Sequence, residues 1–366
     1  MPSVRLRFLP SLPPLTLAAI GLVGVLSAQA VALAQEPEDY ERCLLQRLAT
    51  APGDTPVGEL RRLCQAASLR AAGEPELAEQ VVQPAPPMSE EARKAATPST
   101  MLGLRIQRER EFRDNPFALT ANRPNYFLIG AYSRRTNKEP FIEESGDPDL
   151  DFEHVESKFQ VSFKVPLALG LLDGAADVYA GYTARSFWQL YDRDRSAPFR
   201  ETDHEPEVWL TLYNDWEVLG WRNVANQVGF AHQSNGRSGA LSRSWNRLYA
   251  SFVFESQNAA LFLKPWWRIP EAGSDDENPD IVDYLGHGEI RGALRGGKHV
   301  FSLMLRNHLE SGFSKGTTEL GWSFGFAGYE RLRGYLQLFN GYGESLVDYS
   351  INNTSVGVGV MLNDWL

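Results

Sequence analysis

Residues 228–237 and 242–249 place a histidine, a serine and an asparagine on two expected consecutive strands. His232 and Ser234 are two residues apart, so they share one face of a strand, and Asn246 lies near the start of the next strand. A histidine can take the proton of a serine hydroxyl, and an amide can hold the imidazole in the orientation required. These residue types therefore have the chemistry of an acyl-transfer site, with Ser234 as nucleophile, His232 as proton acceptor and Asn246 orienting His232.

The neighbouring residues indicate where the three side chains point. Phe230 shares the face of His232 and Ser234, and Leu248 shares the face of Asn246. In a membrane barrel this apolar face meets lipid, where each unpaired polar group would cost on the order of a few kcal/mol, so pairing among the three is favoured. The alternative is that they cap strand ends at the headgroup level, because His-x-Ser is by itself a weak pattern.

Residues 112–366 consist of short alternating segments typical of strands, for example residues 356–362. Three features favour membrane strands over a soluble sandwich: segments of about ten residues, small alternate residues such as Gly357 and Gly359, and aromatic residues near segment ends such as Trp266-Trp267. At about ten residues per strand and ten per connection, this segment predicts an all-β fold, a twelve-stranded antiparallel transmembrane β-barrel, with its domain at residues 101–366.

The first hundred residues differ from the rest. Residues 1–34 contain Arg5, Arg7, an apolar run and small residues before Gln35, which predicts a cleaved signal peptide, with an uncleaved anchor helix as the alternative. Residues 35–100 predict a small N-terminal helical extension followed by a Pro/Ala-rich linker. Cys43 and Cys64, the only cysteines, would form a disulfide after export; the alternative is two separate thiols.

Composition excludes several function classes. The formal net charge of −10 disfavours a nucleic-acid partner. After residue 34 no apolar run approaches the roughly 18 residues of a spanning helix, so a helical membrane protein is excluded. The sequence also lacks the P-loop and H-E-x-x-H motifs.

The stretch around His232 and Asn246 resembles outer membrane phospholipase A, the bacterial detergent-resistant phospholipase. The resemblance runs from about residue 122 to the end of the chain and leaves out residues 35–100. It is carried by the residues around the predicted triad and by several further segments, namely 126–128, 156–160, 188–190, 198–202, 264–266, 278–281, 341–346 and 356–364.

This resemblance implies a twelve-stranded barrel in the outer membrane of a Gram-negative-type bacterium. It implies hydrolysis of acyl esters (sn-1 and sn-2) of phospholipids and lysophospholipids, dependence on calcium, one Ca²⁺ per monomer, and activation by homodimerisation. His232, Ser234 and Asn246 match the family's triad.

The same resemblance implies a calcium site that the dimer completes. Its ligands match Ser196 on one subunit and Arg237, through its main-chain oxygen, and Ser242 on the other. A second, monomer-state ligand matches Glu277, with Asp276 as the alternative. The family usually has a glutamine on an adjacent strand that holds the triad asparagine, and the matching position here is Ala184.

The main rival function is a non-enzymatic barrel, either a porin or a scaffold. Large inward side chains such as Arg247, Tyr249 and Glu255 would fill a twelve-stranded barrel, which disfavours a wide channel.

Overall fold

The computed structural model describes residues 38–50, 57–71 and 119–365 without 274–275, 313 and 327–328, together with residues 100, 102–103, 105–106 and 109. The predicted signal peptide, and most of the predicted linker, lie outside the described residues. The chain divides into two compact units, residues 1–87 and 88–366. Among the described residues, no helix is both long and apolar enough to cross a membrane.

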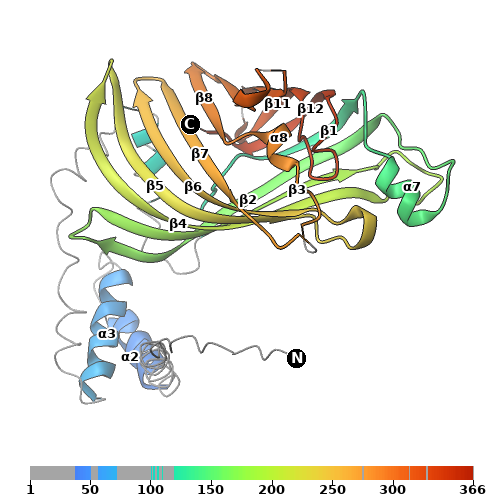
Figure 1. Cartoon of the computed structure of the whole chain (residues 1–366). Coiled ribbons are helices and arrows are strands. Elements are labelled where there is room, and N and C mark those ends of the chain that lie inside the picture. Colours follow the sequence, from blue (N-terminus) through green and yellow to red (C-terminus); the bar gives the residue numbers. More distant parts are fainter. Residues whose placement is uncertain are drawn as a thin grey trace, which may run out of the picture. The chain divides into compact units, whose positions relative to one another are not determined.

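The first unit is a pair of helices, α2 (Glu38–Thr50) and α3 (Val57–Ala71) (Figure 1). A disulfide joins Cys43 on α2 to Cys64 on α3. Cys64 is fully buried beside buried Leu60 and Ala66 on the same helix. Two helices this short bury little apolar surface, so the covalent link supplies stability that the packing alone would not.

The second unit is a closed barrel of twelve strands, which confirms the predicted fold class (Figure 1). Every strand pairs antiparallel with its sequence neighbours, and β1 closes the barrel against β12. In the part of the chain that the structure describes, four of the connections between strands contain a short helix. In chain order the elements are β1 (Asn125–Ser133), α7 (Glu139–Ser145), β2 (Val155–Leu171), β3 (Ala176–Trp188), β4 (Phe199–Val218), β5 (Trp221–Ser234), η1 (Gly239–Leu241), β6 (Ser244–Ser256), β7 (Ala259–Ile269), α8 (Ile281–Leu285), β8 (Gly288–Gly296), β9 (His299–Asn307), η2 (Leu309–Ser311), β10 (Gly316–Phe326), β11 (Tyr329–Gly341) and β12 (Asn353–Asn363).

Residues that alternate in polarity or size along a strand lie on opposite faces of the barrel wall. On β12, Val356 and Val358 are exposed on the outside, while Ser355 and Gly357 are buried. A Cβ atom at Gly359 would lie 2.0 Å from the main-chain oxygen of Phe127 on β1, so only glycine fits this closing seam.

The aromatic pair on β7 also divides between the two faces. Trp267 is exposed on the outer face, as expected of a girdle residue. Trp266 is buried against Trp245 on the inner face, so its predicted place in the girdle is wrong. The reason is the period of the strand, because consecutive residues point to opposite sides.

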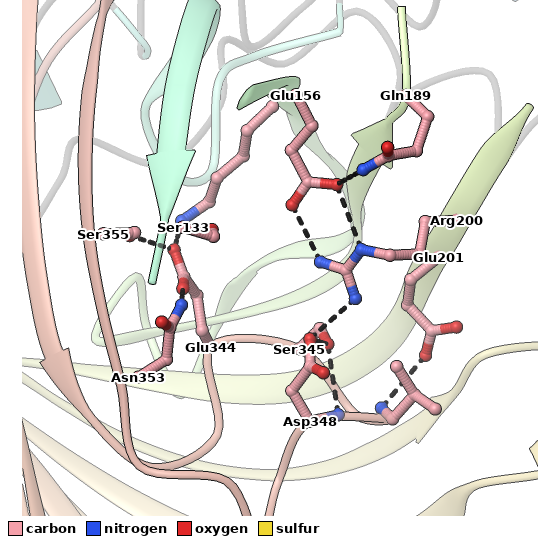
Figure 2. Close-up of polar contacts among 12 residues, drawn as sticks. Ser133, Glu156, Gln189, Arg200, Glu201, Glu344, Ser345, Asp348, Asn353 and Ser355 are labelled. Atoms are coloured by element: carbon pink, nitrogen blue, oxygen red, sulfur yellow. Dashed lines mark hydrogen bonds and ion pairs between the residues drawn. The ribbon is translucent and has the colours of Figure 1, made fainter. Parts of the chain in front are cut away.

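Buried charged side chains contact one another around Arg200 (Figure 2). The Arg200 guanidinium donates two hydrogen bonds to Glu156, at 2.8 and 3.0 Å, and a third to Asp348 at 2.7 Å. Asp348 belongs to the connection between β11 and β12, where residues 343–349 are all buried. This connection therefore folds into the barrel.

A second ion pair binds the same connection to the wall. Lys158 on β2 lies 2.9 Å from Glu344, and both are buried. Ser355 and Asn353 on β12 also donate to the Glu344 carboxylate (Figure 2). Because the buried Glu344 carboxylate has an ion pair and hydrogen bonds to β12, it stabilises the closure of β12 against the rest of the wall.

We expect Lys158→Met to lower the free energy of unfolding by about 3–5 kcal/mol, because Glu344 would stay buried without its cation. The double variant Lys158→Met/Glu344→Gln should lose clearly less free energy of unfolding than the single variant. Urea unfolding in detergent micelles, followed by tryptophan fluorescence, measures both. Lys138→Met, at a half-exposed surface lysine, is the control; an equal loss in that variant would contradict the prediction.

Candidate active site

His232, Ser234 and Asn246 lie together where β5 and β6 meet the loop that joins them. The antiparallel register pairs His232 with Asn246, and Ser234 with Ser244. Outer-face neighbours on these strands are exposed, Val228 by 58% and Leu248 by 45%, whereas the alternating Ala231 is buried. The predicted triad residues are partly buried on the outer face.

The structure brings two of the three into contact. His232 Nδ1 lies 2.9 Å from Asn246 Oδ1. Because an amide oxygen only accepts hydrogen bonds, Nδ1 carries the proton in this contact and Nε2 is left as the basic nitrogen. Asn246 Nδ2 in turn donates to Glu271 Oε1 at 2.7 Å.

Ser234 has no hydrogen bond to His232 among the described residues. Both lie on the same face of β5, with Cα atoms roughly 7 Å apart, the distance across two strand residues. Catalytic hydrogen bonds are often long before substrate binds. On the other side, Ser234 pairs with His204 of β4, whose Nδ1 lies 2.6 Å from the Tyr182 hydroxyl.

Asn235 fixes the loop that follows Ser234. Its side-chain oxygen accepts hydrogen bonds from the main-chain nitrogens of Arg237, at 3.3 Å, and Arg243, at 3.1 Å. Its amide nitrogen donates to buried Glu201 at 3.0 Å and to the main-chain oxygen of Leu241 at 2.7 Å. Asn235 thus holds the two segments that carry Arg237 and Ser242, a role that sequence reasoning missed although the residue stands inside the motif.

Ser196 lies in the connection between β3 and β4. Its φ is 61° and that of Ala197 is 50°, both in the left-handed region that residues other than glycine rarely adopt. Such local strain is found more often at functional sites than elsewhere. The side chain of Arg237 donates to the main-chain oxygens of Phe199 and Arg200, both at 3.1 Å, which ties the Arg237 loop to the start of β4.

The two acids predicted as monomer-state ligands differ in their surroundings. Asp276 accepts a charged hydrogen bond from Arg268 at 2.5 Å, whereas Glu277 is exposed. Asn278 beside them is fully buried, and its oxygen accepts from the main-chain nitrogen of Ser244. The described residues hold no group of three or more histidines, cysteines or acids placed for a metal ion.

Ala184 lies too far from Asn246 for a residue at this position to hold it. Ala184 is on β3 and pairs with His204 on β4, while Asn246 is on β6. Three strand spacings of about 4.8 Å separate them, beyond the reach of a glutamine side chain. Here the amide of Asn246 is contacted instead by Glu271, a residue that sequence reasoning missed.

Comparisons with known proteins identify relatives of this chain. Residues 102–362 match the phospholipase A1 family. Phospholipase A1 of Escherichia coli K12 is 41% identical over 251 residues, which is 69% of this chain and 83% of that protein; the Klebsiella pneumoniae protein is 40% identical over 251 residues, 69% and 84% respectively.

Solved structures of relatives have the same fold as this chain. Outer membrane phospholipase A from Escherichia coli superposes with a TM-score of 0.63 at 38% identity, covering 68% of this chain and all of that one. A calcium-bound dimer of the Salmonella typhi phospholipase gives 0.62 at 38% identity, covering 68% and 94%. An active-site mutant of the Escherichia coli protein, with asparagine replaced by alanine, gives 0.63 at 37% identity, covering 69% and 95%. The chain belongs to the phospholipase A1 family of outer-membrane β-barrel enzymes.

Proposed function

We propose that this protein hydrolyses acyl esters of phospholipids and lysophospholipids, at sn-1 and sn-2, with Ser234, His232 and Asn246 as its triad, and that calcium and homodimerisation activate it. The observation that carries the proposal is the hydrogen bond from His232 to Asn246 on the outer face of the barrel. A base held on this face lies beside the acyl ester bonds of the surrounding lipid. The substrate can therefore reach the base from within the membrane and need not be soluble.

The chemistry follows from the free Nε2 of His232. As Ser234 Oγ bonds to the ester carbonyl carbon, its proton passes to Nε2. The intermediate collapses when His232 returns that proton to the departing glycerol oxygen, which releases the lysophospholipid. A water molecule, deprotonated by His232, then attacks the acyl carbon, and His232 returns the proton to Ser234 Oγ as the bond to the serine breaks and the fatty acid leaves. Asn246 accepts from Nδ1 throughout and keeps the ring in place.

The predicted calcium ligands suit the ion chemically. Calcium prefers oxygen ligands, and Ser196, Ser242 and the main-chain oxygen of Arg237 offer two hydroxyls and a carbonyl. Asn235 holds the Arg237 and Ser242 segments close to Ser234. Bound there, the cation would supply positive charge that stabilises the oxyanion of the transition state. A ligand set completed by Ser196 of a second copy would make activity depend on association.

The relatives support the finer parts of the proposal. One solved relative is a dimer with bound calcium, and another is an active-site mutant at an asparagine. For the monomer-state ion we keep Glu277, because the Asp276 carboxylate is already engaged by Arg268.

Ser234→Ala should lower fatty-acid release from phospholipid in mixed micelles by about 10³-fold or more, because the nucleophile is lost. His232→Ala should be nearly as severe and Asn246→Ala milder. Ser244→Ala, at the cross-strand neighbour of Ser234, is the matched control and should keep activity. Turnover retained by Ser234→Ala would refute the triad.

Removal of calcium with a chelator should stop hydrolysis and shift the protein from dimer to monomer. Ser242→Ala should raise the calcium concentration needed for half-maximal activity, because one oxygen ligand is lost. Ser238→Ala, at an exposed serine of the same loop, should behave as the wild type. Analytical ultracentrifugation in detergent and a calcium titration of activity measure the two effects; full activity in chelator would contradict the calcium assignment.

The rival porin function has a direct test. Residues 343–349 and their buried ion pairs occupy the interior of the barrel, so we expect no stable ion channel. Single-channel recording in a planar bilayer checks this, with a known porin as the positive control. Steady conductance steps would favour the porin function.

A further inference from the structure

We propose that Glu271 is a positioning residue of the triad, which sets the orientation of the Asn246 amide and, through it, the protonation of His232. This inference deepens the proposed function and rests on it. The described residues give a continuous chain: Glu271 Oε1 accepts from Asn246 Nδ2 at 2.7 Å, and Asn246 Oδ1 faces His232 Nδ1 at 2.9 Å.

An asparagine in this position is ambiguous in a way that an aspartate is not. Its amide has an accepting oxygen at one end and a donating nitrogen at the other, and the two ends have nearly the same shape. If the amide of Asn246 were turned over, its nitrogen would donate to Nδ1 of His232. The imidazole proton would then move to Nε2, and His232 could not accept the proton of Ser234.

Glu271 removes this ambiguity. An ionised carboxylate only accepts hydrogen bonds, so the amide nitrogen of Asn246 must face it and the amide oxygen must face His232. A hydrogen bond to an ionised acceptor is also stronger than a neutral one. The carboxylate therefore selects the Nδ1-protonated tautomer, which leaves Nε2 free as the base.

The place of Glu271 follows from the strand register. Ile269, the last residue of β7, pairs with Asn246 of β6 and so shares its outer face. Glu271 is two residues further on, just beyond the end of the strand, and its hydrogen bond to Asn246 places its carboxylate at that face. Pro270 between them has a fixed φ, which restricts the path of the chain from Ile269 to Glu271.

The first test compares steady-state kinetics of Glu271→Ala and Glu271→Gln in the full-length dimer with calcium. We expect Glu271→Ala to lower kcat by about 10- to 100-fold, the usual effect of losing an outer partner of a reacting group, with KM unchanged. Glu271→Gln should recover only part of the loss, because its amide oxygen can accept from Asn246 but the amide can also turn and donate. Glu143→Ala, at an exposed glutamate of α7, is the control and should behave as the wild type.

A double-mutant cycle separates positioning from a general structural role. Because Glu271 acts through Asn246, adding Glu271→Ala to Asn246→Ala should cause no further loss of kcat. An additive loss, or an unchanged kcat in Glu271→Ala, would overturn the inference. If Ser234→Ala kept its turnover, the proposed function itself would fail instead.

The second test needs no turnover. With ¹⁵N-labelled histidine, the ring nitrogens of His232 report its tautomer by NMR in detergent micelles, and a His232→Gln sample assigns the signal among the six histidines. We expect the Nδ1-protonated form in the wild type, and mixtures of tautomers in Glu271→Gln and Glu271→Ala. The same tautomer in all three proteins would overturn the inference.

Discussion

The contact between His232 and Asn246 depends on the register of two adjacent strands. The two residues are direct partners across β5 and β6, so their side chains lie on the same side of the wall. A slip of one residue in either strand would turn its side chain into the barrel, because faces alternate along a strand. The chemistry proposed for the outer face therefore requires a barrel that keeps its register, and the interior supplies that rigidity.

The interior and the candidate active site meet at the Asn235 loop. Asn235 binds the loop carbonyl of Leu241 on one side and buried Glu201 of β4 on the other. Glu201 in turn accepts from the main-chain nitrogen of Val347 in the connection that folds into the barrel. Leu241 and Val347 also pack with Phe141 of α7. The outer loop thus rests on the packed interior, which fits a site that needs fixed geometry.

The loop after β7 adds a second support from the opposite side. Asn278 accepts from the main chain at the start of β6, and Glu271 accepts from Asn246. The loop after β7 thus supplies the acceptor for the Asn246 amide, a contact that the side chain of Ala184 on β3 cannot make.

The sequence by itself predicted the barrel, because a period of two and strand length are local properties, and the family resemblance pointed to His232, Ser234 and Asn246 as the proposed reactive residues. Alternation also placed His232, Ser234 and Asn246 on one face. Only the tertiary structure decided which residues support them. Glu271 reaches Asn246, and Asn235 reaches Glu201, through pairings of strands and loops that separate the partners by 25 and 34 residues. No local pattern encodes such contacts, since they arise from the register and the path of loops after the barrel has closed.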